Sequence, residues 1–184
     1  MQSTLKNNTS KQLLWIGMIG ITMFFAGLTS AYIVRAADAN WLQFNLPNWF
    51  WVSTFSIIIS SILLHLSKTA VKNGNSPILF LLGALSLGIV FTISQFMGWG
   101  QLVSEGVDLI GEGSNPAGSF LYVITLAHLI HLVGGLISII VTTVNASKGK
   151  YNSENYLGIE LTTIYWHFLD ALWLYLFFFM KYIT

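Results

Sequence analysis

Long runs of apolar residues, separated by short polar stretches, divide this chain into five segments. The apolar segments cover residues 13–34, 49–66, 77–99, 119–144 and 156–182. Each reaches or approaches the roughly 20 residues that an α-helix needs to cross a hydrocarbon layer about 30 Å thick. The alternation of apolar and polar positions that marks membrane β-barrel strands is absent from them. The pattern predicts an all-α polytopic membrane protein, a bundle of five transmembrane helices in a single membrane domain over residues 1–184.

The composition supports a membrane protein and excludes several other classes. Hydrophobic residues make up 54% of the chain and charged residues only 8%, whereas a soluble domain carries about 25% charged residues. The formal net charge is +1, so we expect no nucleic-acid partner. The chain has no cysteine, which excludes a disulfide framework, a thiolate nucleophile and an iron–sulfur cluster.

The basic residues predict how the helices are oriented in the membrane. With five segments, one side holds Lys6, Lys11, Lys68, Lys72, Lys148 and Lys150, and the other side holds Arg35 and Lys181. Because basic residues concentrate on the cytoplasmic side, we expect a cytoplasmic N-terminus and a C-terminus outside. The outer side also carries an acidic, glycine-rich stretch over residues 100–118. That stretch either attracts a basic partner protein or packs as a solvated loop on a neighbouring subunit.

Histidines and carboxylates stand inside the last two apolar segments, although an Asp at the centre of a membrane helix costs about 2.5–3.5 kcal/mol. Glu160, His167 and Asp170 follow at offsets of seven and three, which places them on one helical face. His128 and His131 are three residues apart and share a face in the preceding segment. We expect the two faces to meet, with the histidines donating hydrogen bonds to Asp170 and Glu160. This predicts a structural polar clamp between the two helices.

Candidate packing residues lie in the same two segments. Gly134 and Gly135 come one turn after His131, and small residues let membrane helices approach closely. Trp166 and Trp173 flank the polar positions of the last segment. We expect all four residues to take part in helix packing.

Two further interpretations of the polar groups stay open. His and carboxylate can ligate iron or copper, but di-iron bundles use Glu-x-x-His on paired helices, whereas this chain has His167-x-x-Asp170 on one helix. His128 and His131 share a face and cannot hold a haem from opposite sides. A proton or ion path would need polar residues reaching both surfaces. The first three segments contain no ionisable residue except His65, at a segment end, which we expect to reach the interface.

No motif for catalysis is present. The chain lacks a glycine-rich phosphate loop, a helical His pair flanking a Glu, and a Ser-His-Asp order with a positioned nucleophile. We therefore predict no catalytic, cofactor-binding or metal-binding residue. Five helices with one polar clamp favour a non-catalytic subunit of a membrane complex.

Five stretches of the chain resemble a known family. They read MFFAG (residues 23–27), LPNWFWVSTFSI (46–57), LGIVFTISQFMGW (87–99), GSFLYVITLAHLIHLVGG (118–135) and LGIELTTIYWHFLDALWLYLF (157–177). In order and spacing they are similar to the last five helices of subunit III of the haem-copper terminal oxidases, in its short five-helix bacterial form. The last two stretches are the specific ones. They carry the paired histidines and, in family register, Glu160, Trp166, His167, Asp170 and Trp173.

The resemblance implies a function and partners. A subunit III carries no redox centre and supports assembly and stability beside subunit I of a proton-pumping, oxygen-reducing complex. Haem and copper would belong to subunits I and II, and phospholipid would be bound to this chain. We favour cytochrome c oxidase in a bacterial cytoplasmic (inner) membrane, with a periplasmic C-terminus. A cytochrome c or a larger respiratory supercomplex would be a further partner. The alternatives are subunit III of a quinol oxidase, a nitric-oxide-reductase accessory subunit and, more remotely, a free-standing transporter.

The chain departs from the family pattern at three points. The two additional helices of the long form are missing or supplied by another subunit. Family members often carry a Glu just before the FFAG-like segment, where this chain has Ile21. A second Glu that is common after the Gln of the third stretch aligns with Gly98. The carboxylate that the resemblance associates with proton uptake is therefore absent, and a proton-gathering role at that position is not expected here.

Overall fold

The computed structural model describes residues 2–37, 45–111 and 115–183, with side chains from residue 8 onwards. Its five helices are α1 (Gln2–Ala36), α2 (Trp49–Lys72), α3 (Ile78–Ser104), α4 (Pro116–Ser147) and α5 (Leu157–Ile183). All five are long and apolar enough to cross a membrane, and the described residues contain no strand. The predicted fold class, an all-α bundle of five transmembrane helices, is confirmed. The assignment of the whole chain to one domain stays a prediction.

Each helix overlaps its predicted segment, but several continue beyond it. The second segment was expected to end at residue 66, whereas α2 continues to Lys72 and stops before Gly74, whose φ is +75°. Likewise, α4 begins at Pro116, where the side chain of Asn115 accepts a hydrogen bond from the Ala117 amide. A helix ends where its backbone is capped, not where its apolar residues stop, so apolarity alone predicts helices that are too short.

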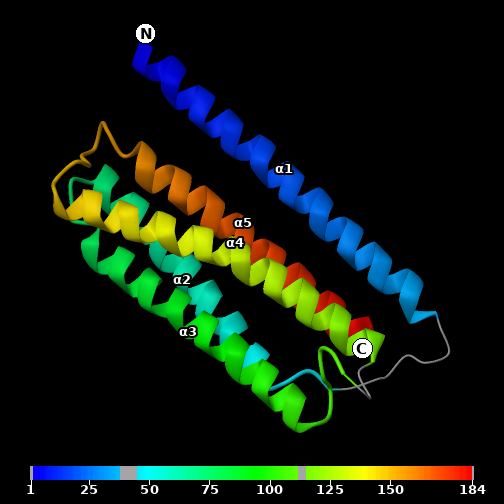
Figure 1. Cartoon of the computed structure of the whole chain (residues 1–184). Coiled ribbons are helices and arrows are strands. Elements are labelled where there is room, and N and C mark those ends of the chain that lie inside the picture. Colours follow the sequence, from blue (N-terminus) through cyan, green and yellow to red (C-terminus); the bar gives the residue numbers. More distant parts are fainter. Residues whose placement is uncertain (1, 38–44, 112–114, 184) are drawn as a thin grey trace.

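Four of the helices form a compact unit, and α1 lies against its outer side (Figure 1). α2 packs along α3, α5 packs on α2 and α4, and α4 also packs on α3. Small residues permit the close contacts: a Cβ at Gly88 of α3 would lie 2.7 Å from a methyl group of Leu136 and 2.9 Å from the ring of Trp166. The Ser60 hydroxyl of α2 donates to the Ala84 carbonyl of α3 at 2.9 Å. Because the hydrophobic effect hardly favours contact between two helices in lipid, close packing and interhelical hydrogen bonds of this kind hold the helices together.

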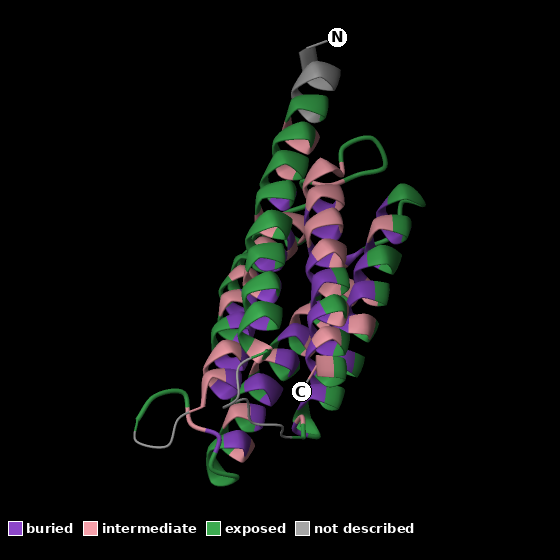
Figure 2. Ribbon diagram, turned by 90° about the vertical axis from the view of Figure 1, so that its right-hand side faces the viewer, coloured by how far each residue is buried: buried purple, intermediate pink, exposed green. Residues whose placement is uncertain are grey.

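α1 is the most exposed helix. Of its most apolar part only 17% is buried inside the protein, against 50% for α2. Figure 2 shows most of its surface as exposed. Its buried positions form one stripe, Met18, Phe25, Thr29 and Tyr32, which faces α4 and α5. The remaining apolar surface of α1 is suited to lipid or to a neighbouring membrane protein.

Candidate functional site

Polar side chains of α5 and α2 meet along one contact between the two helices. On α5 the offsets of seven and three place Glu160, His167 and Asp170 on one face, as predicted from the sequence. The face that meets them belongs to α2, not α4. We define the α2–α5 polar stripe as Ser61, His65 and Lys68 of α2 with Glu160, His167 and Asp170 of α5.

Glu160 lies at one end of the stripe and joins three helices. Its Oε2 atom accepts a hydrogen bond from the Nζ atom of Lys11 of α1 at 2.7 Å, and its Oε1 atom accepts one from the Nζ atom of Lys68 of α2 at 3.1 Å. The Glu160 side chain is 18% exposed, and that of Lys11 36%. We call this the lysine-rich end of the bundle, because Lys72, Lys148 and Lys150 lie there as well. The three charges are paired with one another and leave a single net positive charge in the group.

The middle of the stripe contains two histidines, a hydroxyl and a carboxyl group. The Ser61 hydroxyl and the Nδ1 atom of His167 share a hydrogen bond, and the same hydroxyl lies next to the Asp170 carboxyl group. The rings of His65 and His167 have centroids 6.1 Å apart. One oxygen of Asp170, Oδ1, is buried without a hydrogen-bond partner among the described residues. Asp170 therefore lacks the cation that an ionised carboxylate needs inside a membrane.

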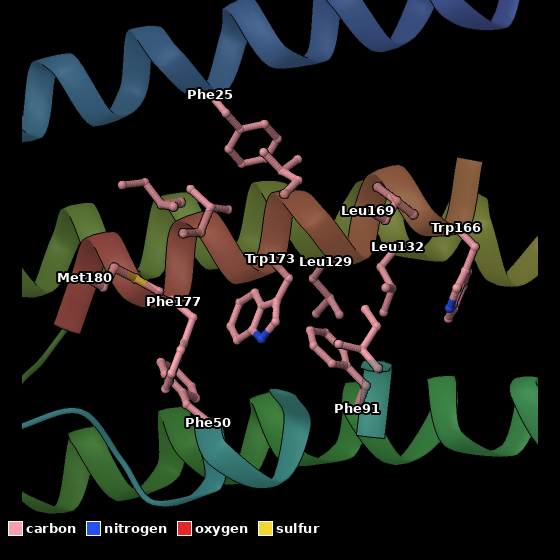
Figure 3. Close-up of a cluster of buried hydrophobic side chains, with 14 of the residues drawn as sticks. Phe25, Phe50, Phe91, Leu129, Leu132, Trp166, Leu169, Trp173, Phe177 and Met180 are labelled. Atoms are coloured by element: carbon pink, nitrogen blue, oxygen red, sulfur yellow. The ribbon is translucent and has the colours of Figure 1, made fainter. Parts of the chain in front are cut away.

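Beyond Asp170 the contact between α5 and α2 becomes aromatic. The ring of Trp173 packs against Phe50 and Phe91, with centroids 5.8 and 5.0 Å away, and its Nε1 donates to the Thr54 hydroxyl at 3.0 Å. Figure 3 shows Trp173, Phe177 and Phe50 filling the space between the two helices. The polar stripe thus reaches the middle of the bundle from the lysine-rich end and stops there.

The predicted pairing of His128 and His131 with the carboxylates is wrong. His128 is fully buried, and neither of its ring nitrogens has a hydrogen-bond partner among the described residues. Its ring lies among Trp173, Phe91 and Phe25, at centroid distances of 5.2, 5.9 and 6.3 Å. The Nδ1 atom of His131 donates to the Ala127 carbonyl of its own helix at 2.7 Å.

Two features explain this error: the register of the antiparallel helices α4 and α5 separates the histidines from Glu160, and the rotation of α5 about its axis turns Asp170 towards α2. The Thr162 hydroxyl bonds to the hydroxyls of Ser138 and Thr142, at 2.7 and 2.8 Å. Glu160 therefore lies beside the C-terminal end of α4. His131 is eleven residues, or about 16 Å, closer to the N-terminus of α4 than Thr142. Asp170 lies next to Ser61 of α2. Hydroxyl groups, not ion pairs, supply the polar links between α4 and α5.

The four predicted packing residues divide into three at close contacts and one in a more open position. A Cβ at Gly135 would lie 2.9 Å from Leu169 and 3.0 Å from the ring of Trp166, whereas at Gly134 the nearest atom is the Tyr165 hydroxyl at 3.7 Å. Trp166 and Trp173 are fully buried. The Trp166 ring lies against α3 at Gly88 and against α4 at Gly135, so it joins three helices.

Sequence reasoning missed the α2 half of the polar stripe. Ser61, His65 and Lys68 are spaced by four and three residues, which is the signal of a shared helical face. The signal was overlooked because the predicted segment ended at residue 66, which left Lys68 outside and His65 at the end. In the structure His65 is exposed but lies well inside α2.

The stripe brings together imidazole, hydroxyl and carboxyl groups, but its geometry is not that of a hydrolase. In a Ser-His-Asp triad the carboxylate orients the second nitrogen of the imidazole, whereas here Asp170 lies next to Ser61. In the part of the chain that is described, no three His, Cys, Asp or Glu side chains are grouped so that they could hold a metal ion.

Comparisons with known proteins agree with the five-helix architecture. The family model described as cytochrome c oxidase subunit III matches residues 14–184. A protein of Synechocystis named cytochrome c oxidase subunit 3 is 29% identical over 179 residues, covering 87% of this chain and 72% of its own. A probable cytochrome c oxidase subunit 3 of Nocardia farcinica is 30% identical over 163 residues, with coverage of 84% and 78%. The chain belongs to the cytochrome c oxidase subunit III family.

Proposed function

We propose that this chain is the non-catalytic subunit III of a proton-pumping cytochrome c oxidase in an aerobic electron transport chain. The observation that carries the proposal is the family match over residues 14–184. The five-helix bundle, with its polar groups engaged mainly between its own helices, supports it. In this proposal haem and copper reside in subunits I and II, and this chain stabilises the complex beside subunit I.

The outward-facing apolar surface supplies the contact with other subunits. Large apolar side chains such as Ile16, Met23 and Val34 of α1 are more than half exposed, as is Leu79 of α3. A neighbouring membrane helix or lipid chains would cover them. Contact with subunits I and II is part of this proposal.

Phospholipid is the ligand that we propose for this chain itself. A pocket of about 260 Å³ between α1 and α5 is lined by Thr22, Phe25, Ala26, Phe168, Ala171, Leu172 and Tyr175. Its almost wholly apolar lining fits a lipid acyl chain. A second groove, near the C-terminal end of α1, is bordered by Gly27, Ala31, Phe120 and Arg35. A guanidinium group in this place suits a headgroup phosphate.

The charge distribution supports a bacterial cytoplasmic membrane with the lysine-rich end in the cytoplasm. That end holds Lys68, Lys72, Lys148 and Lys150, which is the bias expected for cytoplasmic loops. At the opposite end Glu105 and Asp108 are described, whereas Glu112 lies outside the described residues. We propose that this acidic end faces the periplasm, where a cytochrome c or a respiratory supercomplex would be the partner.

The experiment is purification of the affinity-tagged chain from native membranes in mild detergent, with untagged cells as the control. A reduced-minus-oxidised spectrum, mass spectrometry of the subunits and lipid extraction are performed on the same eluate. We expect haem bands, copper-containing partner subunits and co-purifying phospholipid. Band positions and partner masses typical of a quinol oxidase or a nitric oxide reductase would replace the cytochrome c assignment. A colourless chain that elutes alone would overturn the proposal.

A further inference from the structure

The α2–α5 polar stripe reaches only one end of the bundle, the lysine-rich end, and stops at mid-bundle. A simple structural clamp would not need this continuous run of polar groups to a surface. From the lysine-rich end it runs through Lys68 and Glu160 to His65 and His167, and it ends at Asp170. Asp170 lies near the middle of α5. It is ten residues, or about 15 Å along the helix, from Glu160. A polar file of this kind connects one surface with the centre of the bundle.

Asp170 has no counter-charge within the stripe. The charged and titratable groups along the stripe are Lys11 of α1, His65 and Lys68 of α2, and Glu160 and His167 of α5. α4, which also packs on α5, carries His128, whose ring lies against Trp173, and His131, which bonds to the Ala127 carbonyl of its own helix. Both lysines are bound to Glu160 at the far end. Oδ1 of Asp170 is buried without a hydrogen-bond partner in the described structure. An unpaired charge at this depth is costly, and uptake of a proton removes it.

The residues between Asp170 and the surface can all exchange protons. His65 is exposed, His167 is half-buried with its Nδ1 bonded to the Ser61 hydroxyl, and that hydroxyl lies next to Asp170. Imidazole and hydroxyl groups each donate and accept hydrogen bonds. The 6.1 Å between the centroids of the two histidine rings is a separation that a ring rotation or one bridging water can close.

We propose that Asp170 reversibly binds one proton, which arrives from the lysine-rich end through His65, His167 and Ser61. Water at the surface gives a proton to His65, which passes one to His167. His167 gives a proton to the Ser61 oxygen as the Ser61 hydroxyl releases its own to a carboxylate oxygen of Asp170. The carboxylate becomes a neutral carboxylic acid, and the three relay groups are neutral again, with the N–H of each imidazole moved to its other ring nitrogen until the reverse transfer restores it. Release follows the same path in reverse.

The aromatic contact beyond Asp170 makes this site a store and not a channel. Trp173 packs against Phe50 and Phe91, and Trp51 packs against Phe177 at a centroid distance of 4.8 Å. Two groups that can exchange protons lie at this contact. The Thr54 hydroxyl donates a hydrogen bond to the Phe50 carbonyl at 2.7 Å and accepts one from Trp173. His128 lies against the Trp173 ring, but neither of its ring nitrogens has a hydrogen-bond partner among the described residues, so no hydrogen bond links it to the stripe. A proton therefore enters and leaves on the same side. This inference does not rest on the proposed function, because it concerns side chains of this chain alone.

The test is infrared difference spectroscopy on the tagged full-length chain, purified from native membranes together with the subunits that remain bound to it. Stepwise pH changes should reveal the C=O band of a protonated carboxylic acid that titrates reversibly. Asp170→Asn should remove that band, and Asp170→Glu should shift it. The control Glu105→Gln changes an exposed carboxylate at the opposite end and should leave the band in place.

A second variant tests the proton route through His65, and it can still refute the proposal if Asp170 variants fail to assemble. His65 is exposed, so His65→Phe should preserve the fold. Without this entry group, the shift of the acid band on transfer to heavy water should slow by about tenfold or more. A band that Asp170→Asn leaves unchanged would overturn proton binding at Asp170. Exchange as fast in His65→Phe as in the unmodified chain would overturn the proposal by removing its route.

Discussion

Two adjacent glycines of α4 have different surroundings. A Cβ on Gly135 would be 2.9 Å from Leu169 and 3.0 Å from the Trp166 ring, distances that require the neighbours to move. A Cβ on Gly134 would make an ordinary contact of 3.7 Å with the Tyr165 hydroxyl. Only one of the two glycines is therefore needed for the close approach of α4 to α5.

We predict that Gly135→Val destabilises the protein by about 1–3 kcal/mol, the usual cost of overpacking a well-filled interior. Gly134→Val is the matched control, because it adds the same side chain to the same helix one position away. The measurement is thermal unfolding of the purified protein in detergent, followed by circular dichroism. Equal shifts for the two variants would show that the contact at Gly135 is not tight in solution.

At the scale of the element, α1 depends on a few polar contacts with α5. Glu160 accepts from Lys11 at the lysine-rich end, and the Thr29 and Tyr175 hydroxyls share a hydrogen bond of 3.0 Å towards the other end. Apolar packing adds to them: Phe25 packs against His128 and His131, and Tyr32 against Phe120 and Phe179. The ion pair with Lys11 is the polar contact that holds the lysine-rich end of α1.

Glu160→Gln should loosen the lysine-rich end of α1. The variant removes the charge that pairs with Lys11 and Lys68, contacts worth on the order of 1 kcal/mol each at partly exposed positions. We expect faster hydrogen–deuterium exchange in peptides from the first half of α1, with little change in α3. Glu154→Gln removes an exposed charge at the same end and serves as the control. Unchanged exchange in α1 would mean that the ion pairs do not hold this helix.

The sequence predicted the helices well and their pairing poorly, for a physical reason. Apolar length follows from the thickness of a membrane, so each helix could be found from its residues alone. Helical spacing likewise placed Glu160, His167 and Asp170 on one face. Which neighbour meets that face depends on how the other helices are arranged around α5, which packs on both α2 and α4. That arrangement leaves no local signal in the sequence, and the predicted partner of the face was therefore the wrong helix.

At the scale of the whole molecule, the two ends of the bundle differ in charge. Five of the described lysines, Lys11, Lys68, Lys72, Lys148 and Lys150, gather at one end. Arg35 and Lys181 lie at the other, where the ammonium group of Lys181 lies 4.4 Å from the ring centre of Trp51. An indole and a lysine at a helix end are typical anchors at a membrane interface.

We predict that a reporter at the C-terminus is located outside the cytoplasm. Alkaline phosphatase fused there should be active, and green fluorescent protein should be dark, because each folds on only one side of the bacterial membrane. The same reporters at the N-terminus provide the matched control and should give the opposite result. A fluorescent C-terminal fusion would contradict the orientation inferred from the lysines.

The peripheral position of α1 has a consequence for biosynthesis. α1 leaves the ribosome before the other four helices, yet the helices that it contacts, α4 and α5, are made only after α2 and α3. Among the described residues α1 has no extensive contact with α2 or α3, so neither of these helices offers it an early docking surface. During translation α1 must wait in the bilayer while α2 and α3 pair, and it can dock only after α5 has emerged. Its attachment is thus a late step of folding, exposed to competition from lipids and other subunits.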